Sequence, residues 1–151
     1  MRVERVYTRK VFATVRNASI VEAAAMMQRY QVGSLLVMDD EHPRGPPVGI
    51  VTDRDIALQG FASEASVVGS VMTPVVATVH ETSDVHEALE LMRAHGVRRL
   101  LVVGRDGAGR GILSIDDIVD GLSADLAAAA AVLKGEVRRD SAGLGEVHIG
   151  G

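Results

Sequence analysis

The sequence predicts a mixed α/β (α+β) fold in which two copies of one β-α-β-β-α unit pack about a pseudo-two-fold axis. The first observation is an internal repeat, because residues 11–38 match residues 75–103 with one residue inserted near Asp84. The second is that each copy places an amphipathic helical pattern ahead of two short apolar runs. A unit of about 60 residues buries its sheet poorly alone, so we expect the copies to share a core and to leave clefts between them.

The first repeat begins with a short strand, ATV at 13–15, which leads into a helix. Ser19 and Glu22 form a capping-box pattern that satisfies free amide donors in the first turn of this helix. The strand LLVM at 35–38, a loop that contains HPRGPP, the strand GIVT at 49–52 and a short closing helix follow. The helix is apolar along one face, at Ile20, Ala23, Ala24 and Met27.

The second repeat follows the same order. Its first strand is ATV at 77–79, and Asp84 and Glu87 occupy the capping-box positions of its helix. The strand LLVV at 100–103, a Gly-containing loop and the strand GILS at 111–114 precede its closing helix. The matching apolar stripe consists of Val85, Ala88, Leu89 and Met92.

These repeats divide the chain into residues 1–62 for the first unit, 63–134 for the second and a tail at 135–151. The segment FASEASVVGS at 61–70 is the expected linker. The tail mixes Gly with polar residues and shows no period, so we expect it to be mobile.

Composition argues against a nucleic-acid or membrane partner. The net charge is −4, the sequence pI is near 5.7, and the Lys and Arg residues are scattered rather than clustered. Only 3% of the residues are aromatic, which leaves few platforms for stacking bases. The longest apolar run, residues 126–133, is far shorter than the roughly 20 residues that cross a bilayer, and no apolar signal core is present. We therefore expect a cytoplasmic protein.

Metal and catalytic chemistry have little support in the sequence. The chain has no Cys, which excludes disulfides, thiol nucleophiles and thiolate metal sites. Its five His residues show no metal-ligand spacing. No nucleophile elbow and no Gly-rich phosphate loop is present. We expect no metal, no catalytic cofactor and no enzymatic activity, although hydrolysis of a bound nucleotide would reopen the enzyme alternative.

Both closing helices begin with crowded polar residues, TDRD at 52–55 and SIDD at 114–117. Thr or Ser with Asp three residues later is a capping-box pattern that needs no ligand. The same place also suits a nucleotide, because a helix N-terminus attracts phosphate and a nearby carboxylate can accept two hydrogen bonds from a sugar diol. From these residues alone, a cap and a ligand site are both open.

The order of an ATV strand, a capped helix, an LLVV-type strand and the pattern G-h-h-[ST]-x-x-D occurs twice in register. It resembles a pair of cystathionine-beta-synthase (CBS) domains, the Bateman module. The resemblance covers residues 6 to about 122, and VMTP at 71–74 is similar to the opening of such a repeat. It implies that AMP, ADP, ATP, NAD or S-adenosylmethionine binds as a regulatory ligand in the cleft between the repeats.

By position, the resemblance places the ribose hydroxyls on Asp55 and Asp117, with Thr52 and Ser114 near ribose or phosphate. It places the adenine between strand residues, near Thr8 and Ala13 or near Thr73 and Ala77. The full set that it assigns to the nucleotide is Thr8, Ala13, Thr52, Arg54, Asp55, Thr73, Ala77, Arg98, Arg99, Ser114, Asp116 and Asp117.

Arg98 and Arg99 stand where related repeats direct basic side chains toward phosphates, and paired guanidiniums grip oxygens bidentately. The first repeat departs from this pattern, because Gly33 and Ser34 occupy the matching positions. A phosphate clamp is therefore expected from the second repeat, whose arginines can serve a shared central cleft.

The two junctions also differ from each other. Ile115 stands opposite Asp53, and Asp116 stands opposite Arg54, so matched positions differ in charge. We expect the two sites to differ in their preference for charged ligands.

We interpret the chain as a stand-alone regulatory module that senses an adenosyl nucleotide and signals to a partner protein. Bateman modules usually pair, so we expect a homodimer through the apolar faces of the short closing helices. These faces consist of Ile56, Leu58, Ile118, Val119 and Leu122. The alternatives are packing of these residues within the chain and, for function, a structural dimerisation module without a ligand.

Overall fold

The structure is a computed structural model that describes residues 1–59, 67–75 and 77–141. Much of the expected linker, and the tail from residue 142, lie outside these residues. The first repeat contains β1 (Ala13–Val15), α1 (Ile20–Tyr30), β2 (Ser34–Met38), β3 (Gly49–Thr52) and α2 (Asp53–Gln59). The second contains β5 (Thr78–His80), α4 (Val85–His95), β6 (Arg99–Val103), β7 (Gly109–Ser114) and α5 (Ile115–Ser141). The short elements ahead of the repeats are η1 (Val3–Arg5), α3 (Val68–Val71) and β4 (Thr73–Pro74). The predicted β-α-β-β-α order is confirmed in both copies.

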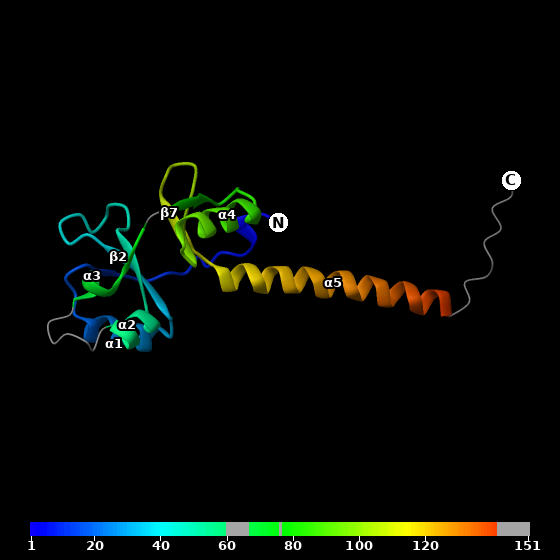
Figure 1. Ribbon diagram of the computed structural model, residues 1–151, viewed down its shortest axis with the longest axis horizontal. Coiled ribbons are helices and arrows are strands. Elements are labelled where there is room, and N and C mark those ends of the chain that lie inside the picture. The colour runs from blue at the N-terminus through cyan, green and yellow to red at the C-terminus, as the bar shows by residue number, and fades with distance from the viewer. Residues whose placement is uncertain (60–66, 76, 142–151) are drawn as a thin grey trace.

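Each repeat forms its own sheet with the same pairing (Figure 1). β1 is parallel to β2 and β3 is antiparallel to it, and β5, β6 and β7 repeat this arrangement. A residue from ahead of the other repeat then extends each sheet, since Thr73 pairs with Ile50 in β3 and Thr8 pairs with Ile112 in β7. The two units are therefore interlocked through their leading segments.

This exchange continues into the cores. Val3 and Tyr7 are buried in the core of the second repeat, together with residues of α4 and β6. Val68 and Val71 are buried in the core of the first repeat, together with residues of α1 and β2. Each unit thus depends on a segment that precedes the other one in sequence.

A third apolar cluster joins the two sheets. It consists of Leu36 and Ile50 from the first sheet and Leu101 and Ile112 from the second. Leu36 matches Leu101 and Ile50 matches Ile112 in the repeat alignment, so the contact is pseudo-symmetric. The shared core that the repeat predicted is confirmed.

The long helices begin where the capping patterns predict. Ser19 and Glu22 form the reciprocal box, with Glu22 N donating to Ser19 Oγ at 3.0 Å and Ser19 N donating to Glu22 Oε2 at 3.2 Å. Asp84 caps α4 differently from the prediction, because its carboxylate accepts from His86 N at 2.8 Å instead of pairing with Glu87. An N-cap carboxylate can reach the second amide of a helix as readily as the third.

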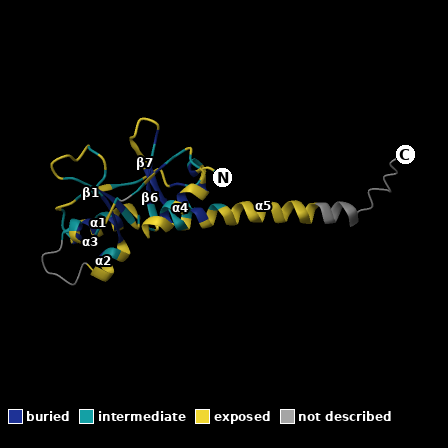
Figure 2. Cartoon of the chain, turned by 45° about the horizontal axis from the view of Figure 1, so that its top comes forward, coloured by how far each residue is buried: buried dark blue, intermediate teal, exposed yellow. Residues whose placement is uncertain are grey.

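The closing helices differ greatly in length, contrary to the expectation of two short ones. α2 has 7 residues, whereas α5 has 27 and extends away from both units as a single rod (Figure 1). Residues 135–141 of the expected tail are helical because α5 runs through Gly135 without a break. Ile118 is buried at the base of α5, whereas residues 122–135 are exposed (Figure 2).

The expected dimer face is corrected in part by this packing. Ile56 and Ile118 are buried in the cores of their own repeats, so neither is available to a partner. Leu58, Val119 and Leu122 are exposed. Among the described residues, no helix is both long enough and apolar enough to cross a membrane.

Candidate functional site

The two strand-to-helix junctions have the same hydrogen-bonded geometry. Thr52 N donates to Asp55 Oδ2 at 2.9 Å, and Asp55 N donates to Thr52 Oγ1 at 3.1 Å. Ser114 N donates to Asp117 Oδ2 at 2.9 Å, and Asp117 N donates to Ser114 Oγ at 3.1 Å. Both motifs are therefore capping boxes, as the residue pattern predicts.

The capping hydrogen bond occupies only one of the two carboxylate oxygens of each aspartate. Each of these backbone bonds ends on Oδ2, so the Oδ1 atoms of Asp55 and Asp117 accept no hydrogen bond within the described part of the chain. Both residues are half-buried at cleft walls. A carboxylate that is held by its own backbone and has a spare acceptor is already oriented for a hydroxyl-bearing ligand.

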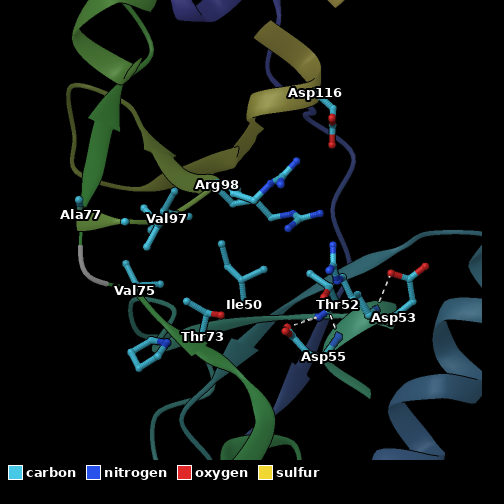
Figure 3. Close-up of a pocket in the computed structure, with 15 residues that line it drawn as sticks. Ile50, Thr52, Asp53, Asp55, Thr73, Val75, Ala77, Val97, Arg98 and Asp116 are labelled. Atoms are coloured by element: carbon cyan, nitrogen blue, oxygen red, sulfur yellow. Dashed lines mark hydrogen bonds between the residues drawn. The ribbon is translucent and has the colours of Figure 1, made fainter. Parts of the chain in front are cut away.

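The first cleft, named here for the Thr52–Asp55 box, has a volume of about 540 Å³ (Figure 3). It lies between the repeats, with Thr52, Asp53 and Asp55 on one side and Val97, Arg98 and Asp116 on the other. Eight of the twelve residues assigned from the sequence line it: Thr52, Arg54, Asp55, Thr73, Ala77, Arg98, Arg99 and Asp116.

The second cleft, named for the Ser114–Asp117 box, has a volume of about 390 Å³. Thr8, Arg99, Ser114 and Asp117 line it, and all four were assigned from the sequence. Its remaining walls are Lys10, Val11, Val32, Gly33, Ser34, Asp53 and Ile112. Each cleft is thus built from the capping box of one repeat and residues that precede or belong to the other.

Ala13, which the sequence assigned to the adenine site, lines neither of the two clefts. It is an exposed residue of β1 paired with Leu36, whereas its counterpart Ala77 does line the first cleft. The chain reaches the second cleft two residues earlier, at Val11. Val11 is the counterpart of Val75, which lines the first cleft, so this wall position is the same in both repeats.

The clefts differ in their cations. The first is lined by Arg54, Arg98 and Arg99, and the second by Lys10 and Arg99. None of these four forms an ion pair with another residue of the described ranges, where the salt bridges involve the N-terminus, Arg2, Arg5, Arg93 and Arg110. Each cleft also contains as many carboxylates as cations: Asp53, Asp55 and Asp116 in the first, and Asp53 and Asp117 in the second.

Sequence reasoning missed several wall residues. Val32 and Val97 occupy matching positions immediately before Gly33 and Arg98, and both line clefts, so the repeat itself carried a signal for them. Lys10 is the basic residue that follows Thr8 at a spacing of two, which places both on the same side of an extended segment. The presence of Asp53 in both clefts has no signal in the sequence.

One further cluster lies on the β2–β3 loop, where ligand atoms of Asp39, Glu41 and His42 lie within 4.8 Å of one another. The expected lack of metal spacing around the His residues overlooked this group. Asp39 Oδ1 already accepts from Glu41 N at 2.9 Å, and Glu41 and His42 are exposed. Exposed acidic groups of this kind are common without a metal, so we assign it no function.

Comparison with known proteins identifies the repeats. The family model of the CBS domain matches residues 3–59 and 68–124. An uncharacterized 17.7 kDa protein from Acidianus ambivalens is 35% identical over 122 residues, which cover 80% of this chain and 73% of that protein. The chain also matches the inosine-5'-monophosphate dehydrogenase of Helicobacter pylori at 31% identity, but it covers only 20% of that enzyme.

Two solved structures with bound ligands are similar to the fold. The CBS domain pair of protein MJ0100, in complex with 5'-methylthioadenosine and S-adenosyl-L-methionine, is 26% identical with a TM-score of 0.69, and the match covers 83% of this chain and 98% of that one. The CBS domain protein PAE2072 from Pyrobaculum aerophilum, complexed with AMP, is 30% identical with a TM-score of 0.64, and the match covers 78% and 89%.

Proposed function

The chain belongs to the CBS-domain family, and from this premise we propose that it is a regulatory module that binds adenosyl nucleotides in the clefts between its repeats and signals their presence to a partner protein. The observation that carries the proposal is the duplicated capping box, in which Asp55 and Asp117 each present an unused carboxylate oxygen at a cleft wall. Ligands of this class in the MJ0100 and PAE2072 structures support it.

The nucleotide is expected to lie across each cleft in the same direction. Its ribose diol donates to Asp55 Oδ1 or Asp117 Oδ1, because these acceptors are fixed by the caps. In the first cleft the adenine packs between aliphatic side chains, Val75, Ala77 and Val97, and the phosphates face the arginines. This arrangement needs no aromatic platform and therefore suits a chain poor in aromatic residues.

The cations of the first cleft favour ligands that carry phosphate. The guanidiniums of Arg54, Arg98 and Arg99 can each bind two phosphate oxygens, which adenosine lacks. AMP, ADP, ATP or NAD is therefore the expected ligand class for this cleft. Arg99→Ala is expected to weaken ATP more than adenosine, and Ser34→Ala to have a much smaller effect.

Regulation follows from the way in which the repeats share each site. A ligand in the first cleft bridges the Asp55 cap of one repeat and Arg98 and Asp116 of the other, so it fixes their relative position. A partner detects such a change only if the ligand binds one arrangement more tightly than another.

We further expect the chain to pair as a homodimer. The helix α5 exposes Val119, Leu122, Leu126 and Leu133 at spacings of three, four and seven, which is the pattern of an apolar seam on one helix face. A helix that leaves its own fold with such a seam gains little stability alone. Light scattering should give a mass near twice 16.0 kDa at micromolar protein, and the monomer mass would reject the pair.

The proposed ligand binding is tested by thermal shift with AMP, ADP, ATP, NAD and S-adenosylmethionine. A ligand at about 100 times its Kd stabilises the folded state by about 2.7 kcal/mol, which moves the Tm by several degrees. If no member of this set shifts the Tm at millimolar concentration, the alternative of a dimerisation module without a ligand is favoured.

A further inference from the structure

Two residues, Asp53 and Arg99, line both clefts. Arg99 lies at the start of β6 and pairs across the sheet with Ser114, the residue that opens the second capping box. Asp53 is the first residue of α2, and its amide donates to the Gly33 carbonyl at 3.0 Å. The wall that the clefts share therefore contains one cation from the second repeat and one anion from the first.

The guanidinium of Arg99 is not held by an anionic partner. Within the described ranges it takes part in none of the ion pairs, and its side chain is half-buried. Arginine has a long rotatable stem and a planar fork that grips two phosphate oxygens together. One such fork can serve a phosphate in one cleft or in the other, but not in both.

The clefts depend on Arg99 to different degrees. The first cleft has two cations of its own, Arg54 and Arg98. The second has only Lys10. Loss of Arg99 to a neighbouring phosphate therefore removes one of three cations from the first cleft but one of two from the second.

The geometry points to Arg99 as a shared phosphate ligand that couples the two clefts, an inference that rests on the proposed nucleotide binding. A phosphate-bearing nucleotide in the first cleft draws Arg99 to itself and weakens a phosphate-bearing nucleotide in the second. By linkage, the second ligand weakens the first by the same factor. A nucleoside without phosphate does not bind Arg99, so it leaves the nucleotide affinity of the other cleft unchanged.

Calorimetry with ATP and with adenosine tests the coupling. Asp55→Ala disables the first cleft and leaves Arg99 to the second. ATP should then bind the second cleft of this variant at least tenfold more tightly than it binds the weaker of the two sites in the unaltered chain. A tenfold change is the effect expected for one charge-assisted hydrogen bond. Adenosine should show less than a twofold difference between the same two events. Arg99→Ser, which introduces the residue of the matching position Ser34, should abolish the ATP difference when it is combined with Asp55→Ala.

Two controls separate this coupling from other effects. Arg98→Ala weakens ATP in the first cleft but leaves the helix cap and Arg99 intact, so the two ATP events of this variant should remain coupled. If Asp55→Ala proves unstable, adding Arg99→Ser to Arg98→Ala should remove that coupling. Direct repulsion between two bound polyphosphates persists in Arg99→Ser and decreases with salt. A tenfold ATP difference that survives Arg99→Ser at 0.1 M salt, about a 10 Å screening length, overturns the shared-arginine role.

The remaining outcomes are equally distinct. Equal ATP affinity for the second cleft in the unaltered chain and in Asp55→Ala overturns the coupling but leaves the proposed function standing. Failure of ATP and adenosine to bind the unaltered chain overturns the coupling, and failure of AMP, ADP, NAD and S-adenosylmethionine as well overturns the proposed function.

Discussion

Replacing Asp117 with Ala separates its role as a helix cap from its proposed role as a ribose ligand. In the folded chain, Asp117 Oδ2 accepts from Ser114 N at 2.9 Å, and Asp117 N donates to Ser114 Oγ at 3.1 Å. The substitution removes the first bond and keeps the second. We therefore expect the ligand-free protein to lose about 0.5–2 kcal/mol of unfolding free energy, the usual effect of removing a cap.

The effect on ligand binding is expected to be larger than the cap alone explains. Removal of the charged acceptor leaves ribose hydroxyl donors unpaired in a half-buried site, which costs about 1.5–3 kcal/mol. This loss corresponds to a decrease in affinity of more than tenfold. Because the ribose is common to both probes, adenosine and ATP should be affected alike.

Two measurements distinguish the roles: urea unfolding of the ligand-free variants and calorimetric titration with adenosine. Asp117→Asn is a matched control, because its amide oxygen still accepts from Ser114 N but carries no charge. Asp55→Ala provides the same test in the first cleft. Unchanged adenosine affinity in both Asp55→Ala and Asp117→Ala, at protein concentrations where the variants are folded, would refute the ribose assignment.

Three further predictions concern stability and pH. Gln31 ends α1 with φ 53°, where its counterpart Gly96 ends α4 with φ 63°, so Gln31→Gly should raise the unfolding free energy by about 1 kcal/mol in urea. Gly111→Ala should destabilise the fold by several kcal/mol, because a Cβ there meets the Thr8 carbonyl oxygen that pairs the leading segment with β7. The pKa of Asp84 is lowered, first by the hydrogen bond from a backbone amide and then by the N-terminal amino group, so its contribution is present at neutral pH and is lost as pH falls below about 4.

Each of these has a control within the chain. Gly96→Gln should lower the free energy of unfolding by about the amount by which Gln31→Gly raises it. If both substitutions raise it, the positive φ is not the cause. Gly135→Ala should stabilise α5 by up to about 1 kcal/mol, because nothing lies within 4 Å of the added Cβ. Asp84→Asn should flatten the acid limb of the urea-midpoint curve, and identical curves for both proteins would contradict the assigned cause.

Much of the fold was predictable because the chain contains two copies of one structural unit. A capped helix and its flanking strands are local in sequence, so Ser19 with Glu22 and Thr52 with Asp55 give the same signal in isolation as in the fold. The second copy turned a weak pattern into a specific one. For this reason the family, the β-α-β-β-α order and the position of both aspartates follow from the sequence.

Only the tertiary structure shows how the strands and helices of the two repeats pack together. Which leading segment completes which sheet depends on long-range pairing, and so Thr8 lies with the second repeat and Thr73 with the first. The length of α5 was not predicted because the tail was expected to begin at Gly135, whereas a helix tolerates a glycine at a cost of about 1 kcal/mol.

The sequence by itself determined the two motifs, but only packing placed Arg99 and Asp53 at the wall of both clefts. Alignment assigns each residue one counterpart in the other repeat and therefore one site. A pseudo-two-fold axis instead brings the two sites next to each other, so a residue close to the axis borders both. That proximity depends on the contact of Leu36 and Ile50 with Leu101 and Ile112, which joins residues far apart in the chain and has no local signature.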